Sequence, residues 1–242
     1  MPGDSLSWGD AAYRELLARD DVRAYADLLA GYGRANVTGA RGSSRAAAEL
    51  IGDSLALLEV DELLAAAGSN VPGPWADLGS GGGLPGIALA LALPVAHVTL
   101  IEAVGKKCAF LRDTVGELGL GERVEVACAR SEELAATGAP GRERFAVVLA
   151  KAVGSLAVVV ELASPLLCRG GVLLASKTAA AGRREAAGGE AAGAACGLAP
   201  RRLVSLTRSP LSDSVCVVYE KISPTPERFP RRPGMAAKRP LA

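Results

Sequence analysis

The 242-residue sequence predicts an α/β fold built on a seven-stranded, doubly wound sheet with an antiparallel edge strand, preceded by N-terminal helices. Two observations support this prediction. Short apolar runs alternate with helical patterns from about Trp75 to Ile222 without a break in composition. A glycine-rich turn follows the first run and leads directly into an apolar helical segment. Because strands and helices alternate, the sheet should be largely parallel and should bind ligands at the carboxyl ends of its strands.

Two helices are expected before the sheet, over residues 13–32 and 44–64, because leucine, valine and tyrosine recur there at helical spacing. A turn at 35–39 separates them, and a linker at 69–74 leads into the first strand. We therefore expect a helical extension over 1–70, the α/β domain over 71–223 and a basic, Pro- and Gly-rich tail over 224–242. The length suffices for one sizeable buried core.

The elements of the sheet follow in order along the chain. Strands are predicted at 75–79, 98–102, 124–128, 146–151, 171–176, 202–206 and 215–222, with helices at 86–93, 106–118, 155–167 and 179–196. No helical pattern separates the last two strands, so they should form an antiparallel pair at one edge, joined through 208–213. Residues 182–193 are rich in alanine and glycine, and each glycine weakens a helix by up to about 1 kcal/mol, so we expect a mobile surface element there.

The turn after the first strand reads Asp-Leu-Gly-Ser-Gly-Gly-Gly-Leu-Pro-Gly over residues 77–86. Glycine lets the backbone turn sharply at a strand end and approach a ligand closely, because no Cβ intervenes. Pro85 suits the entrance of the next helix, where its missing N–H has no helical partner to lose. Gly81, Gly83 and Gly86 satisfy the G-x-G-x-x-G pattern, so the turn alone fits either a dinucleotide or S-adenosylmethionine.

Two acidic residues favour S-adenosyl-L-methionine. Asp77 lies just before the turn, where a dinucleotide would bring an anionic pyrophosphate but S-adenosylmethionine would bring a cationic ammonium and sulfonium. Glu102 ends the next strand, where a carboxylate can accept hydrogen bonds from both ribose hydroxyls; a helix cap or a solvated strand end is its alternative role. The sequence therefore predicts a Rossmann-like class I methyltransferase.

The cysteines and the single histidine argue against other kinds of site. None of the cysteines makes a metal-ligand spacing with His97, so no metal site is expected and His97 is assigned no catalytic role. The cysteines are widely spaced and odd in number, so we expect them to be reduced; they are Cys108, Cys128, Cys168, Cys196 and Cys216. No apolar run is long enough to span a bilayer and no secretory signal is visible, which favours a cytoplasmic protein without membrane contact.

The sequence also restricts the group that accepts the methyl. It has no Asn/Asp-Pro-Pro-aromatic tetrapeptide, which usually accompanies methylation of exocyclic amino groups, and no Pro-Cys pair for attack on cytosine C5. The segment after the fourth strand, 149–156, offers Lys151 and small residues but no evident base. Guanine N7 needs no base, because it has an in-plane lone pair and no proton to lose, so positioning could supply most of the catalysis. Small-molecule amines or thiols remain alternatives.

Several segments, taken in order, resemble one family. They are the turn with its Leu-Pro-Gly, the Ile-Glu-Ala-Val-Gly-Lys-Lys run at 101–107, Arg-Ser-Glu-Glu at 130–133, Lys-Ala-Val at 151–153 and the Pro-Arg-Arg-Pro-Gly-Met ending from 230. Together they are similar to ribosomal RNA small subunit methyltransferase G, also called glucose-inhibited division protein B, over nearly the whole chain from about Asn36. The resemblance implies methylation of a guanine at N7 in the decoding region of 16S ribosomal RNA, with the small ribosomal subunit as partner.

The resemblance also assigns cofactor positions. They are Gly79 and Leu84 in the turn, Ser131 and Glu132 after the third strand, and the basic residue after the fourth. That residue is Lys151, where the family usually has arginine, and a flexible ammonium is not equivalent to a two-pronged guanidinium. Lys151 is also a candidate for positioning the reactants. The segments 36–38 and 53–55 resemble the family as well, although the histidine that commonly precedes the Asp-Ser pair is absent.

An RNA partner should be met by basic side chains. The net charge is only +1, but the C-terminal segment is basic; a solvated tail is the alternative reading of that charge. Two lysines open the helix after Glu102, where they oppose the helix dipole, so we assign at least one of them to RNA phosphate. The candidate RNA-binding residues are Lys106, Lys107, Lys177, Arg231, Arg232 and Lys238.

Three other functions are open from the residues. A NAD-dependent oxidoreductase fits the G-x-G-x-x-G spacing, although Asp77 opposes it. A methyltransferase for a small molecule fits the acceptor argument but leaves the basic tail unexplained. A non-catalytic RNA-binding or assembly factor is suggested only by Lys151 in place of arginine.

Overall fold

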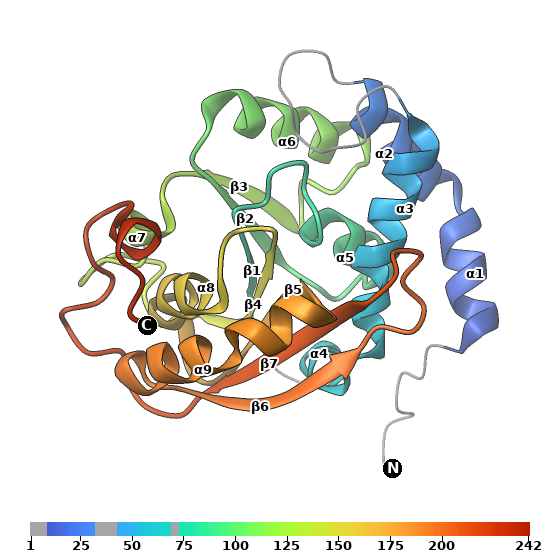
Figure 1. The fold of residues 1–242 in the computed structure, drawn as a ribbon. Coiled ribbons are helices and arrows are strands. Elements are labelled where there is room, and N and C mark those ends of the chain that lie inside the picture. The colour runs from blue at the N-terminus through green and yellow to red at the C-terminus, as the bar shows by residue number, and fades with distance from the viewer. Residues whose placement is uncertain (1–8, 32–42, 69–72) are drawn as a thin grey trace, which may run out of the picture.

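A computed structural model describes residues 9–31, 43–68 and 73–242, and it shows one central sheet covered by helices (Figure 1). The strands are β1 Trp75–Leu78, β2 Val98–Glu102, β3 Val124–Cys128, β4 Phe145–Lys151, β5 Leu167–Thr178, β6 Leu198–Ser205 and β7 Ser214–Lys221. They lie in the order β3-β2-β1-β4-β5-β7-β6. The pairs among β1 to β5 are parallel, whereas β7 is antiparallel to both β5 and β6. The doubly wound sheet with an antiparallel pair at one edge is confirmed.

The helices alternate with the strands after an N-terminal helical group. That group consists of α1 Asp10–Ala18, α2 Asp20–Gly31, α3 Ser44–Leu55, the 3-10 helix η1 Ala56–Glu59 and α4 Asp61–Gly68. The sheet helices are α5 Gly86–Ala92, α6 Gly105–Glu117, α7 Ser131–Leu134, α8 Leu156–Ala163, the 3-10 helix η2 Ser164–Leu166, and α9 Ala179–Cys196. A short α10, Met235–Lys238, follows near the C-terminus. No helix among these described segments is long and apolar enough to cross a membrane.

The core has two parts, one on each face of the sheet. On one face the N-terminal helices, α5 and α6 pack together, and on the other α8 and α9 do so. Successive side chains of β4 alternate between these clusters: Val147 and Leu149 join the first, Val148 and Ala150 the second. Because both faces are covered, such strands read in the sequence as continuous apolar runs.

The predicted bounds of an element match the structure where its hydrophobic pattern covers the same residues as its hydrogen-bonded pairing. β2, β3 and α9 begin and end where the sequence predicted, whereas β5 is longer because it pairs with β4 and β7 well beyond its apolar centre. The helix expected at 13–32 is two helices, since Arg19 has extended backbone angles and its N–H bonds back to the Leu16 carbonyl. The helix expected at 44–64 is α3, η1 and α4. The expected turn at 35–39 and the segment 36–38 lie outside the described residues, as does most of the linker at 69–74.

The expectation of a mobile element at 182–193 is wrong. These residues form the interior of α9, which packs against α8 and the sheet. A Cβ at Gly189 would lie 2.2 Å from the Tyr219 hydroxyl oxygen and 2.9 Å from Leu156 Cβ. This glycine therefore permits close packing, and tertiary contact offsets its low helix propensity.

The C-terminal segment packs against the domain, while Arg232 and Lys238 on it are exposed. Phe229 is buried, and Arg142 donates hydrogen bonds to the carbonyl oxygens of Phe229 (2.8 Å) and Thr225 (3.0 Å). Figure 1 shows the C-terminal segment, in red, folded back over the side of the domain that carries α8. The basic charges of this segment therefore belong to an ordered surface.

Candidate functional site

The carboxyl ends of the parallel strands surround a cavity of about 210 Å³. It lies where the strand order reverses between β1 and β4, which is where open α/β sheets bind ligands. Its walls come from the glycine turn, the ends of β2 and β3, the segment after β4, α8 and the C-terminal segment. The lining residues are Leu78, Gly79, Ile101, Glu102, Ala103, Ala129, Arg130, Ser131, Glu132, Val153, Val158, Leu162, Gly234, Ala236 and Ala237.

The glycine turn is built as the sequence predicted. Gly79, Gly81 and Gly83 all have positive φ, and α5 begins directly after Pro85. The N–H groups of Gly79 and Ser80 donate to the Ile101 carbonyl at 2.9 and 3.0 Å, which ties the turn to the end of β2. The turn therefore places its backbone at the cavity.

Asp77 supports this turn from behind. Its side chain is fully buried, and Oδ2 accepts a 3.0 Å hydrogen bond from the Gly86 N–H at the start of α5. A Cβ at Gly86 would lie 2.8 Å from that same oxygen, so only glycine allows this approach. The other oxygen, Oδ1, has no hydrogen-bond partner. Burial raises the pKa of Asp77 to about 7, outweighing the hydrogen bond from Gly86. The carboxylate does not line the cavity, so any effect on a ligand acts through its charge and through the turn.

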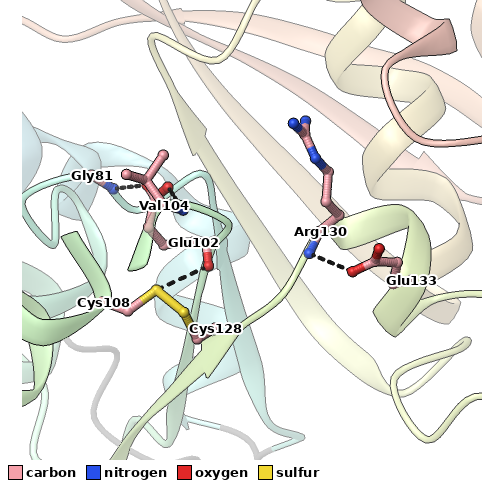
Figure 2. The surroundings of a disulfide bond; sticks show 7 residues. All are labelled: Gly81, Glu102, Val104, Cys108, Cys128, Arg130 and Glu133. Carbon is pink, nitrogen blue, oxygen red and sulfur yellow. Dashed lines mark hydrogen bonds between the residues drawn. A yellow bond between two sulfur atoms is a disulfide. The ribbon is translucent and has the colours of Figure 1, made fainter. Parts of the chain in front are cut away.

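Glu102 reaches the cavity itself. Its Oε2 accepts from the Gly81 N–H at 3.0 Å and its Oε1 from the Val104 N–H at 2.8 Å, as Figure 2 shows. The carboxylate thus joins the glycine turn to the start of α6. Because a carboxylate has about four acceptor positions, these two bonds leave capacity for ribose hydroxyls.

The residues expected after β3 lie together in the cavity wall. Ser131 and Glu132 begin α7, and Ser131 Oγ lies 3.2 Å from Glu132 Oε2. Glu132 Oε1 accepts a 2.8 Å hydrogen bond from the Gly234 N–H of the C-terminal segment. Leu84, by contrast, packs into the core on the face of the N-terminal helices and does not line the cavity.

Lys151 points to α3 rather than to the cavity lining. Its Nζ lies 2.5 Å from Asp53 Oδ2, 3.1 Å from Ser54 Oγ and 3.2 Å from the Leu50 carbonyl. Burial alone raises the pKa of Asp53, but the ion pair with Lys151 and hydrogen bonds from two serine hydroxyls bring it below its ordinary value. This pair therefore joins the end of β4 to the N-terminal helices.

The six candidate RNA-binding residues divide into two groups. Lys106, Arg232 and Lys238 are exposed, and Lys107 is half-buried at the start of α6. The side chains of Lys177 and Arg231 lie against carboxylates. Lys177 Nζ lies 2.9 Å from Glu185, with its side chain largely covered, and Arg231 pairs with the buried Glu161. The structure therefore gives Lys177 and Arg231 structural contacts.

The expectation that every cysteine is reduced is wrong for one pair. A disulfide joins Cys108 on α6 to Cys128 at the end of β3, across 20 residues of sequence (Figure 2). The two are brought together because α6 follows β2 and β3 pairs with β2, which sequence spacing alone does not reveal. The remaining three, Cys168, Cys196 and Cys216, are free. No group of metal-ligating side chains that could hold an ion occurs in the described part of the chain.

Some cavity residues were missed by sequence reasoning. Gly234, Ala236 and Ala237 belong to the Pro-Gly-Met ending, which resembles a family segment and whose basic charge is its only signal in the sequence. Arg130 is exposed at the rim, and its guanidinium extends away from Glu133 (Figure 2). A larger groove of about 730 Å³ lies between α2 and α6 but lacks the glycine turn, and its Asp27, Asp113 and Glu117 do not suit RNA phosphate.

Comparison with known proteins identifies the family. The family model for rRNA small subunit methyltransferase G matches residues 19–211. Ribosomal RNA small subunit methyltransferase G of Rubrobacter xylanophilus is 42% identical over 239 residues, covering 97% of this chain and 87% of the relative. Its counterpart from Deinococcus radiodurans is 37% identical over 188 residues, covering 75% and 72%. The CcbJ methyltransferase from Streptomyces caelestis has a similar fold, with a TM-score of 0.55 and 17% identity over 72% of this chain and 90% of that one. The chain therefore belongs to the rRNA small subunit methyltransferase G family.

Proposed function

We propose that this protein transfers the methyl group of S-adenosyl-L-methionine to N7 of a guanine in the 16S RNA of the small ribosomal subunit. Family membership is the observation that carries the donor and the RNA class. The choice of guanine N7 rests on the sequence resemblance and on the acceptor chemistry. A protein that modifies ribosomal subunits works where they are assembled, so we also propose a cytoplasmic location.

The cavity residues suit this cofactor. Glu102 retains acceptor capacity for ribose hydroxyls, and Val153, Val158 and Leu162 offer apolar surface for an adenine ring. Asp77 carries an unpartnered oxygen directly behind the turn, and in its ionised form it would favour a ligand with ammonium and sulfonium groups. Gly79, Ser131 and Glu132 also line the cavity; Gly81, Gly83 and Leu84 do not, and they join the proposed cofactor set for their place in the turn. When bound, the cofactor supplies an activated methyl group.

The chain's own contribution to catalysis is positioning. The N7 lone pair of guanine attacks without losing a proton, so no general base is required. Lys151 is committed to Asp53, with Nζ and Oδ2 only 2.5 Å apart, and it is not placed as a free acid or base. We assign Lys151 the role of holding α3 against the end of β4 beside the cavity. This structural role explains how lysine can stand where the family usually has arginine.

The exposed basic residues form the proposed RNA surface. Lys106, Lys107, Arg232 and Lys238 belong to α6 and the C-terminal segment, which carry or flank the cavity walls, and Arg130 lies at the rim. Such charges attract RNA through its phosphates and make the affinity depend on salt.

The decisive experiment is transfer of labelled methyl from S-adenosylmethionine to small subunits from a strain that lacks the gene. The modified nucleoside is then identified by mass spectrometry, and N7-methylguanosine in 16S RNA is expected. Labelling of another nucleoside would contradict the N7 assignment. Binding of S-adenosylhomocysteine without any transfer to subunits would favour a small-molecule acceptor or a non-catalytic role.

A further inference from the structure

The C-terminal segment 225–238, which we call the strap, forms part of the cavity wall. Gly234, Ala236 and Ala237 line the cavity together with Val158 and Leu162 of α8. Figure 1 shows the strap lying against the α7 and α8 side of the domain. A segment that begins after the last strand therefore closes a site built by α8 and the ends of the first four strands.

The first half of the strap is anchored away from the cavity. Besides the two bonds from Arg142, the Thr225 N–H donates to Glu143 Oε1 at 2.7 Å. Lys221 at the end of β7 is buried and donates to Ser164 Oγ at 2.7 Å, and its Nζ also contacts the Thr225 hydroxyl. The strap thus starts from a fixed point.

Arg231 fixes the second half. Its Nε donates to Glu161 Oε1 at 2.6 Å, and an Nη donates to the other oxygen of the same carboxylate, which gives a two-pronged ion pair. The same Nη donates to the Arg239 carbonyl at 2.8 Å, so the pair also holds the end of α10. Glu161 is buried on α8, the helix whose Val158 and Leu162 line the cavity.

The strap also contacts a residue of the proposed cofactor set. The Gly234 N–H donates to Glu132 Oε1 at 2.8 Å, and the other oxygen of Glu132 faces Ser131. The orientation of Glu132 in the cavity therefore depends on the strap being in place.

We infer that the strap is the outer wall of the S-adenosylmethionine pocket and that Arg231 is a positioning residue for the cofactor, acting through Glu161. This inference rests on the proposed function. It separates two neighbouring arginines of equal charge: Arg231 serves the cofactor side, whereas the exposed Arg232 is left for RNA.

The pair Arg231→Gln and Arg232→Gln tests this assignment, because each variant of the full-length protein loses the same single charge. Calorimetric titration with S-adenosylhomocysteine, without RNA, should show binding weakened by about tenfold in Arg231→Gln and by less than about twofold in Arg232→Gln. The salt dependence of RNA binding should fall by about one unit of slope in Arg232→Gln only. In turnover assays, Arg231→Gln should raise KM for the methyl donor and leave KM for the subunit unchanged.

A second pair protects the test against a folding defect, because Arg231→Gln leaves the buried Glu161 without its ion pair. Ala237→Trp adds bulk at a lining position and leaves the ion pair intact. Lys238→Trp places a tryptophan one residue outside the lining and serves as its control. Only Ala237→Trp should weaken binding of S-adenosylhomocysteine.

The outcomes separate the two proposals. Equal cofactor affinity in both arginine variants, or tighter binding in Arg231→Gln, would overturn the strap assignment while leaving the proposed function intact. Equal binding by both tryptophan variants would also overturn it. A wild-type protein that does not bind S-adenosylhomocysteine would overturn the proposed function and this inference together.

Discussion

Asp77 makes the stability of the cofactor-free protein depend on pH in a direction opposite to that of most carboxylates. Burial raises its pKa in the folded state to about 7, from 3.8 in the unfolded chain. Between those values the folded state holds a proton that the unfolded state has lost, so stability falls as pH rises through this window. The variant Asp77→Asn keeps an oxygen for the Gly86 N–H and cannot titrate.

The magnitude follows from the two pKa values. A difference of one bound proton over one pH unit changes the free energy of unfolding by about 1.4 kcal/mol. Between about pH 5 and pH 7.5, the difference in protons bound to Asp77 in the folded and unfolded states integrates to nearly two pH units. Asp77 should therefore cost the wild type about 2 to 3 kcal/mol over that range. The pH range stops below about 8 because burial lowers the pKa of Lys221 to about that value. Above it, Lys221 loses its proton in the folded state before it does so in the unfolded chain, so stability would rise with pH.

Urea unfolding of both proteins at the two pH values measures this effect. The free energy of unfolding of the wild type, minus that of Asp77→Asn, should fall by about 2 to 3 kcal/mol from the lower to the higher pH. Other titrating groups are common to both proteins and cancel in this difference. Parallel pH profiles would show that Asp77 is ionised in the folded state throughout and would refute the argument from burial.

Three further predictions concern the fold. The denatured protein should show three reactive thiols without reductant and five with it; five in both cases would refute the disulfide. Gly189→Ala should lower the free energy of unfolding by about 1 to 3 kcal/mol. Gly188→Ala should be neutral or stabilising, because its Cβ would lie 3.7 Å from the nearest atom. Equal effects of the two substitutions would contradict the packing of α9. Lys151→Met should lower the free energy of unfolding in urea by about 3 to 5 kcal/mol, because it leaves the buried Asp53 carboxylate without its ion pair. In an Asp53→Asn background the same substitution should cost much less, and an equal cost in both backgrounds would show that the ion pair is not the cause.

The sequence predicted the sheet well because its signals are local. Apolar runs, a glycine turn and a helix without breakers each specify one element, and right-handed parallel connections leave few ways to assemble them. It failed where the decisive contact is distant. Sequence alone identifies Gly189 as a helix breaker, because it does not show that Tyr219 packs against this position. It likewise gives Cys108 and Cys128 no partner, because the pairing of β2 with β3 brings them together.

In the proposed site, too, the sequence identifies the residue types but not the partners that they contact. The sequence predicted that an acid near the glycine turn favours the ligand's cations. The structure buries Asp77 behind the turn, where it accepts a hydrogen bond from the first N–H of α5. Two adjacent arginines in the tail are equivalent in sequence, yet only Arg231 finds a buried carboxylate on α8. Charge and motif therefore identify which groups a site uses, whereas burial and partner decide which of them can reach the ligand. For this chain, the charge-matched comparison of Arg231 and Arg232 measures that difference directly.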